Sequence, residues 1–176
     1  MDKRWFVAIV NARHEKAVVE KLLQLGIGAY AATQREMHQW ANGRRRAVDR
    51  VVIPSMVFIH CSDQERLCIV QLPYILRFLV NRAADSGSLN KPVAVIPQEE
   101  MDRLQFILGH SDTPVNFVPT VYRIRDNVRV IRGPLRDLVG QITENSDGSH
   151  SLKVGMAMLG GVVIRINACD VERIPE

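Results

Sequence analysis

Residues 126–142 read DNVRVIRGPLRDLVGQI, and this stretch decides the fold of the C-terminal part of the chain. Valine and arginine alternate through its first half, which is typical of a β-strand with one buried and one exposed face. Gly133 and Pro134 then predict a tight turn, because glycine tolerates unusual backbone conformations and proline fixes φ. We expect Leu135 to form an exposed apolar tip, and Gly140 to let the chain pack closely as it enters the next strand. The stretch therefore predicts two strands joined by a turn.

Short segments of the same kind fill the rest of the C-terminal part. Strands are expected at 128–131, 139–143, 151–154 and 161–166, with turns at 132–134 and 145–148. Several short strands at close spacing predict a small β-barrel. The polar segment HSDTP at 110–114 indicates a linker before it. We therefore expect a linker over 110–119 and a barrel domain over 120–176.

The N-terminal part alternates strands and helices. Residues 5–10, WFVAIV, are apolar throughout, as expected of a strand covered on both faces. Asn42-Gly43 predicts a hairpin turn, and acidic residues after Pro97 predict the start of a helix. Further elements are expected as a helix over 13–24, strands over 48–53 and 56–61, and a helix capped by Asp63. The pattern predicts an α+β domain over 1–109, with a mixed sheet flanked by helices.

Composition limits the classes of function. The chain has 176 residues, of which 47% are hydrophobic, and a net charge of +4. That apolar fraction argues against a disordered tail, and no apolar run reaches the about 20 residues that span a bilayer. Residues 5–10 are too few for the core of a signal peptide. We expect a cytoplasmic protein that does not bind membranes, with a charge that permits a polyanionic partner.

Residue types that carry chemistry are scattered. The five histidines and three cysteines show no metal-ligand spacing, and no nucleophile or phosphate-binding motif occurs. A hydrolase using His60 or Cys61 is disfavoured, because neighbouring residues on a strand point to opposite faces. We expect no catalytic residue, no metal and no cofactor, and therefore no enzyme.

The stretch 126–142 resembles the KOW motif of NusG-type transcription elongation factors and some ribosomal proteins. In the first half, WFV at 5–7, RHE at 13–15 and VIPSMVFI at 52–59 resemble the N-terminal domain of NusG proteins, as do PYILRFLV at 73–80 and PVAVIP at 92–97. The matches run in order over nearly the whole chain. Among subfamilies, the chain looks most like the UpxY-type specialised paralogues, which are antiterminators of surface-polysaccharide operons.

The resemblance implies an N-terminal NusG domain over 1–109 and an SH3-like KOW barrel over 120–176. In this family an apolar depression on the first domain receives the clamp helices of the largest subunit of RNA polymerase, which favours processive transcription. The residues here that match this surface are Trp5, Ile53, Pro54, Met56, Phe58 and Phe78. Ser55-Met56 replaces the Gly-Tyr of the family motif. The bland alternative is that Met56, Phe58 and Phe78 are ordinary core residues.

Two sets of residues are candidates to contact nucleic acid. The resemblance implies that Arg13 and His14 match a region that faces the non-template DNA strand in relatives. The cluster Arg44, Arg45 and Arg46 is by its own charge a candidate to contact phosphates of DNA or nascent RNA. Both sets are alternatively solvated surface residues. The barrel tip, Gly133, Pro134 and Leu135, matches a loop that contacts a ribosomal protein or Rho, although Leu135 replaces an aromatic residue. The alternative overall reading is a KOW-type RNA- or ribosome-binding protein without polymerase association.

Overall fold

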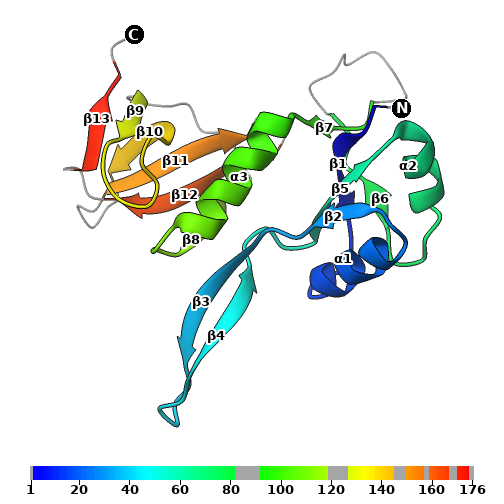
Figure 1. Ribbon diagram of the computed structural model, residues 1–176, viewed down its shortest axis with the longest axis horizontal. Coiled ribbons are helices and arrows are strands. Elements are labelled where there is room, and N and C mark those ends of the chain that lie inside the picture. Colours follow the sequence, from blue (N-terminus) through cyan, green and yellow to red (C-terminus); the bar gives the residue numbers. More distant parts are fainter. Residues whose placement is uncertain are drawn as a thin grey trace. The chain divides into compact units, whose positions relative to one another are not determined.

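The computed structural model describes residues 2–81, 92–118, 127–144, 150–156, 159–166 and 170–174 (Figure 1). The chain divides into two compact units. Unit 1 comprises Met1–Thr33 and Ile53–Arg103, and unit 2 comprises Gln34–Val52 and Leu104–Glu176. Within the described ranges, no helix is both long and apolar enough to cross a membrane.

Unit 1 is built on a five-stranded antiparallel sheet in the order β2-β5-β1-β6, with β7 also paired to β1. Its strands are β1 (Arg4–Ile9), β2 (Gly28–Tyr30), β5 (Met56–Cys61), β6 (Arg77–Phe78) and β7 (Val95–Ile96). Its helices are α1 (Glu15–Gln24), α2 (Asp63–Ile69) and the start of α3 (Gln98–His110). The predicted strands over 5–10 and 56–61 and the predicted helices are confirmed.

Alternate residues of β1 and β5 point to the same face of the sheet and form the core of unit 1. Phe6 and Ala8 of β1 lie in one apolar cluster with Val57 and Ile59 of β5. Helix α1 buries Val18 and Leu22, four residues apart, in the same cluster. One face of the sheet is therefore sealed by α1, as its amphipathic pattern predicts.

Helix α2 begins one residue earlier than the sequence suggested. Ser62, not Asp63, is the N-cap, and its side-chain oxygen accepts a hydrogen bond from the Glu65 amide. The Glu65 carboxylate in turn accepts from the Ser62 amide at 2.7 Å. Both members of a capping box are present, so the prediction of Asp63 as the cap is wrong.

Unit 2 contains a two-stranded hairpin and a six-stranded antiparallel sheet. The hairpin is β3 (Thr33–Gln39) with β4 (Arg45–Val51). The sheet, called here the C-terminal sheet, has the order β13-β9-β10-β11-β12-β8. Its strands are β8 (Val115–Val118), β9 (Asn127–Val130), β10 (Val139–Glu144), β11 (His150–Met156), β12 (Gly160–Ile166) and β13 (Val171–Arg173).

The strands β9 to β12 of the C-terminal sheet match those expected from the sequence. The segment that precedes them, expected to be a linker, differs. A Cβ at Gly140 would lie 2.7 Å from the Lys153 carbonyl oxygen, which confirms the close packing predicted there. Residues 115–118, expected within a linker, form β8 and pair with β12. The predicted turn at 145–148 lies outside the described residues. No pairing among the described strands joins β13 to β8, so closure into an SH3-like barrel stays a prediction.

The compact units also group the chain differently from the expected domains. Residues 34–52 belong to unit 2 although they were expected inside the domain over 1–109. Compactness alone does not decide which segment folds independently, so the boundaries at 109 and 120 stay predictions.

Candidate functional site

The six residues expected to contact polymerase differ in exposure. Ile53 and Phe58 are completely buried and Phe78 is buried nearly as well. Pro54 is exposed, whereas Trp5 and Met56 are half-buried. Only the last three can therefore touch a partner directly in this structure. Phe58 instead lies beneath the surface, with its ring centroid 6.2 Å from that of Tyr30.

Trp5 has a fixed orientation on the surface of β1. Its ring is stacked on His60 of β5 at a centroid distance of 4.9 Å. Its indole N–H donates to the Gln98 Oε1 atom at 2.8 Å. Two elements therefore hold the indole, so its accessible part is a preorganised apolar surface.

The turn before β5 is held by a buried carboxylate. Ser55 has φ +62°, a left-handed conformation that favours glycine, and it stands where the family motif has glycine. The Glu15 side chain, only 2% exposed, accepts the Ser55 backbone N–H at 2.6 Å. The Ser55 carbonyl accepts from the Val10 amide at 3.0 Å. These bonds offset the strain and place Pro54 and Met56.

Arg13 and His14 lie at the entrance to α1. Both are exposed, and Arg13 adopts φ +70°. His14 occupies the N-cap position without a side-chain cap, and its Nδ1 atom lies 3.1 Å from the Ala12 carbonyl oxygen. These two residues belong to unit 1, whereas the arginines at 44–46 belong to unit 2. The predicted nucleic-acid residues thus fall into two separate groups.

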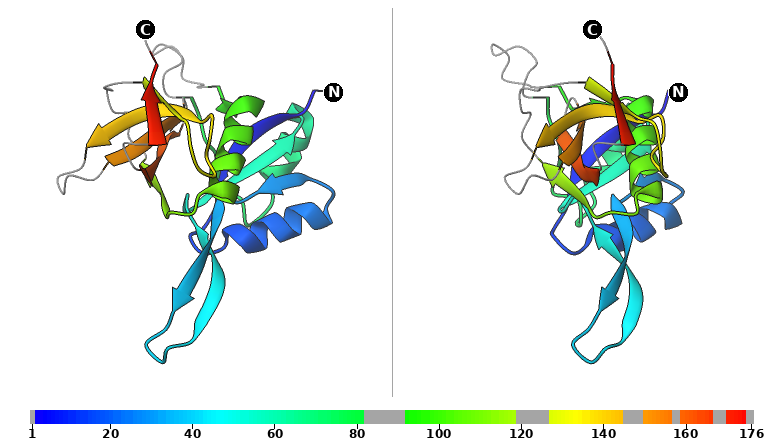
Figure 2. Two further views of the ribbon diagram at one scale, coloured as in Figure 1. Left: turned by 60° about the vertical axis from the view of Figure 1, so that its left-hand side comes forward. Right: turned by 90° about the vertical axis from the view of Figure 1, so that its left-hand side faces the viewer.

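The hairpin tip is ordered by Gly43. This residue has φ +79° and donates its N–H to the Trp40 carbonyl at 2.9 Å. The Trp40 N–H donates to the Arg44 carbonyl, also at 2.9 Å, so these two residues face each other across a three-residue loop. The predicted Asn42-Gly43 turn is confirmed. Figures 1 and 2 show the tip standing clear of the C-terminal sheet of its own unit.

Alternation divides the hairpin side chains between two faces. One face, called here the aromatic–basic face, carries His38, Trp40, Arg44 and Arg46. Its two rings touch edge to face at 4.7 Å between centroids. The opposite face carries Arg45, whose Nε donates to the Gln39 Oε1 atom at 3.1 Å. The sequence candidates omitted Trp40, although its position beside the Asn-Gly turn and the arginines was a usable signal.

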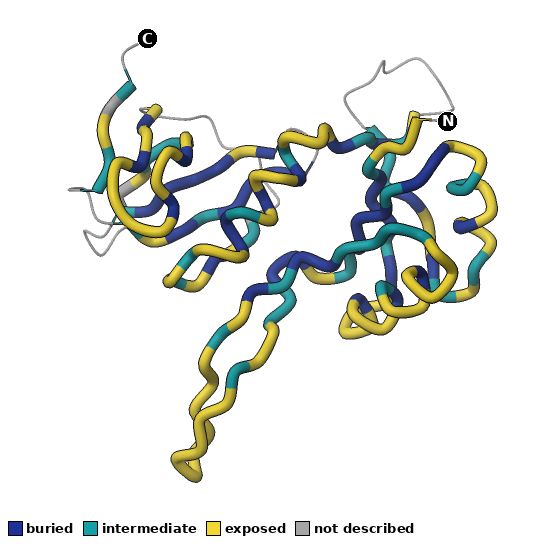
Figure 3. Tube along the Cα trace, in the orientation of Figure 1, coloured by how far each residue is buried: buried dark blue, intermediate teal, exposed yellow. Residues whose placement is uncertain are grey.

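The base of the hairpin is tied to β8. Gln34, 3% exposed, donates to the carbonyls of Ser111 and Thr113 at 3.2 and 2.9 Å and accepts from the Val115 amide at 2.8 Å. Arg50 donates to the Val115 carbonyl at 2.8 Å and to the Glu36 carboxylate at 2.7 Å. These bonds anchor the hairpin at its base. Figure 3 shows the tip of the hairpin in the colour of exposed residues and its base in the colours of buried and half-buried residues.

The turn expected as an exposed tip is partly folded inward. Gly133, with φ +86°, and Pro134 are exposed, but Leu135 is only 7% exposed. The prediction of an exposed Leu135 is wrong, because the Asp137 amide bonds the Val130 carbonyl and folds the turn back. Leu135 lines a pocket of about 180 Å³ beside Pro134 and Arg165.

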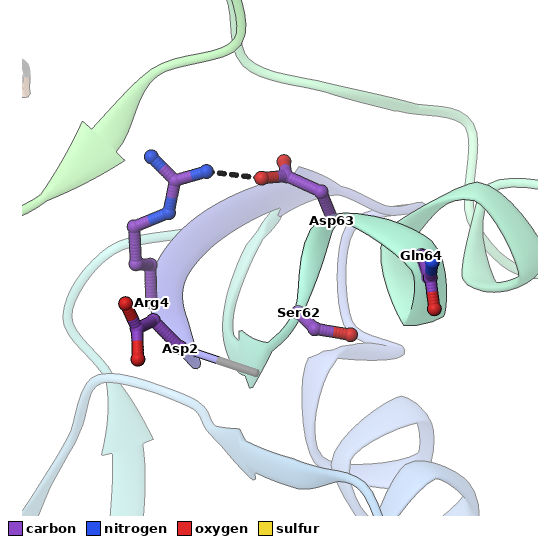
Figure 4. Close-up of a pocket in the computed structure, with 5 residues that line it drawn as sticks. All are labelled: Asp2, Arg4, Ser62, Asp63 and Gln64. Carbon is purple, nitrogen blue, oxygen red and sulfur yellow. Dashed lines mark hydrogen bonds and ion pairs between the residues drawn. The ribbon is translucent and has the colours of Figure 1, made fainter.

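Burial also affects two ionisable groups outside the predicted site residues. Burial lowers the pKa of Lys153 on β11 and raises the pKa of the Cys61 thiol to about 11. A pocket of about 370 Å³ lies beside the start of α2, where Arg4 pairs with Asp63 (Figure 4). Among the described residues, no three His, Cys, Asp or Glu side chains gather in a way that could hold a metal ion.

Three comparisons with known proteins bear on the family and the fold. Residues 3–105 match the family model described as transcription termination factor nusG. The transcription termination/antitermination protein NusG of Pseudomonas aeruginosa is 22% identical over 99% of this chain and all of its own length. The NusG of Bacillus subtilis is 25% identical over 91% of this chain and 92% of its own. A structure titled "Domain interaction in Thermotoga maritima NusG" matches with a TM-score of 0.51 and 17% identity, covering 99% of both chains.

The fold and the sequence matches agree along the chain. The matched family region contains the whole sheet of unit 1. The relatives are transcription termination and antitermination factors by name. This chain therefore belongs to the NusG family.

Proposed function

We propose that the protein is a specialised antitermination factor that binds the clamp helices of bacterial RNA polymerase and promotes processive transcription. The observation that carries the proposal is the family match over residues 3–105, which contains every residue of the polymerase surface expected from the resemblance. Its target class would be surface-polysaccharide operons, as in the UpxY-type paralogues. The segments RHEK at 13–16 and QW at 39–40, followed by a basic turn, support that choice.

The accessible part of the polymerase surface is Trp5, Pro54 and Met56. Trp5 is held in place by His60 and Gln98, and the strained turn at Ser55 presents Pro54. Methionine adapts its shape to a partner, so Met56 suits a groove that receives helices. Phe58 supports this surface from below. A factor that prefers the processive state of polymerase by about 1.4 kcal/mol changes the ratio of active to paused complexes tenfold.

The turn at Gly133 and Pro134 is the proposed contact for a second factor, a ribosomal protein or Rho. Its exposed residues and the adjoining pocket lined by Leu135 offer a small apolar site with Arg132 and Arg165 at its walls. Arg13 and His14 are the proposed contacts to the non-template strand near the polymerase. The positive φ of Arg13 supports a functional role, because strained residues are kept where a side chain must be positioned.

Co-purification of polymerase with the tagged chain tests the proposal. Met56→Glu places a charge on the accessible surface, so we expect at least a tenfold loss of co-purified polymerase. Met37→Glu is the matched control, because Met37 is 68% exposed on the hairpin. Equal recovery of polymerase with both variants would contradict the proposal that Met56 lies in the polymerase-binding surface. Recovery of ribosomes without polymerase would favour the alternative function as an RNA- or ribosome-binding protein.

A further inference from the structure

The hairpin concentrates the positive charge of the molecule. Residues 34–52 contain five arginines and two carboxylates, a formal charge of +3 out of +4 for the whole chain. Glu36, one of the two carboxylates, is already paired with Arg50 at the hairpin base. The tip therefore presents a strongly positive surface, which complements a polyanion.

Aromatic groups accompany this charge on one face. Trp40 is 42% exposed beside three arginines, which is high for a residue type that is strongly buried on average. Its edge-to-face contact with the His38 ring orients the indole. That single contact does not cover both faces of the indole. An exposed aromatic plane beside arginines is the arrangement that binds unpaired nucleic acid, since a base can stack on the ring while phosphates bind the arginines.

From these observations we propose that the aromatic–basic face binds single-stranded RNA. One base stacks on Trp40, and the neighbouring phosphates bind Arg44 and Arg46. A duplex does not suit this face, because paired bases expose only their edges. The inference goes beyond the proposed function, since it needs no polymerase.

RNA fits the face better than DNA because of its 2′-hydroxyl groups. His38 adds an imidazole, which can accept a hydrogen bond from a ribose 2′-hydroxyl, whereas arginine and tryptophan side chains only donate. Gln34 and Arg50 fix the base of the hairpin to β8, which limits how far the hairpin can move. A hairpin held at its base loses less entropy on binding than one that moves freely.

Fluorescence anisotropy with the full chain and a labelled 12-nucleotide oligouridine tests the proposal. Trp40→Ala should weaken binding about tenfold, as expected for the loss of one stacked base. Arg44→Ala with Arg46→Ala should weaken binding and reduce the slope of log affinity against log salt by about 1.4, for two lost phosphate contacts. Quenching of tryptophan fluorescence by the oligonucleotide should disappear in Trp40→Phe, although Trp5 remains.

The matched control removes one charge from the opposite face. Arg35→Ala should change the affinity less than threefold, whereas Arg46→Ala alone should weaken it by more. Equal losses for Arg35→Ala and Arg46→Ala, with no effect of Trp40→Ala, would overturn the proposal in favour of diffuse attraction to any polyanion. A deoxyuridine 12-mer differs by the 2′-hydroxyls, so equal affinity for it would overturn the assignment to RNA. Absence of binding by the unaltered chain, or tighter binding of a duplex, would overturn the proposal as a whole.

Discussion

Strand β5 and the β3–β4 hairpin are neighbours in the sequence and opposites in structure. Val57, Phe58 and Ile59 of β5 are completely buried in unit 1. The hairpin tip in unit 2 is exposed throughout, including Trp40. Both segments carry an aromatic residue that sequence patterns allow as a surface contact. An aromatic residue therefore stabilises the fold where other strands cover it, and is available to bind a partner where a turn exposes it.

The two segments also use their backbones differently. Entry into β5 requires the strained Ser55, which a buried carboxylate from α1 holds. Entry into β4 uses Gly43, which adopts its positive φ without strain. The first turn depends on a distant partner, whereas the second is encoded by a local dipeptide. Mutations should therefore spread their effects in unit 1 and stay local at the hairpin tip.

The largest expected change in stability separates the two aromatic residues, Phe58 of β5 and Trp40 of the hairpin. Phe58→Ala should destabilise the protein by about 3–5 kcal/mol, because it leaves a cavity in a sealed core. Trp40→Ala should change stability by less than about 0.5 kcal/mol, as exposed substitutions do. Urea unfolding followed by circular dichroism measures both. A large loss from Trp40→Ala would mean that the indole is packed rather than displayed.

A smaller effect is expected at the strained turn. Glu15→Ala removes the acceptor of the Ser55 amide and should cost about 2 kcal/mol, since a buried donor is left unpaired. Glu20→Ala is the control, because Glu20 is exposed on the same helix. Thermal unfolding of both variants checks the prediction. Equal melting temperatures for the two would show that Ser55 does not depend on the carboxylate.

The smallest expected change in stability distinguishes the base of the hairpin, which is bonded to residues 111–115, from its tip. Gln34→Ala should cost about 1–2 kcal/mol, because three hydrogen bonds to residues 111–115 are lost. Gln39→Ala, near the tip, should be nearly neutral. Hydrogen exchange at the Val115 amide should accelerate only in the first variant. Faster exchange in both would place the anchor further along the hairpin.

Local patterns predicted much of this fold. The apolar run at 5–10 predicted β1, and Asn42-Gly43 predicted the hairpin turn, since each signal lies within a few residues of its effect. The helices over 15–24 and 98–110 followed from apolar periodicity and acidic starts. Capping was harder, because Ser62 and Asp63 are both good cap residues and only geometry selects the first.

The candidate site was less predictable, because exposure depends on distant contacts. Leu135 sits in a turn that local rules place at the surface, yet a backbone bond to Val130 folds it inward. Gln34 contacts Val115, 81 positions away, and no local pattern reports such a pair. The family resemblance named Phe58 as part of a contact surface, but alternation within β5 could not say which of its faces is covered. Such questions are decided by tertiary packing.

The anchor of the hairpin also has a consequence for solubility. Among the described strands, β8 is the last of the C-terminal sheet, and a terminal strand with free amides and carbonyls invites pairing with another polypeptide. The Val115 amide and carbonyl are already occupied by Gln34 and Arg50. An incoming strand would have to displace both side chains before it could form backbone hydrogen bonds with Val115. Gln34 and Arg50 therefore oppose the pairing of another polypeptide with β8 at Val115.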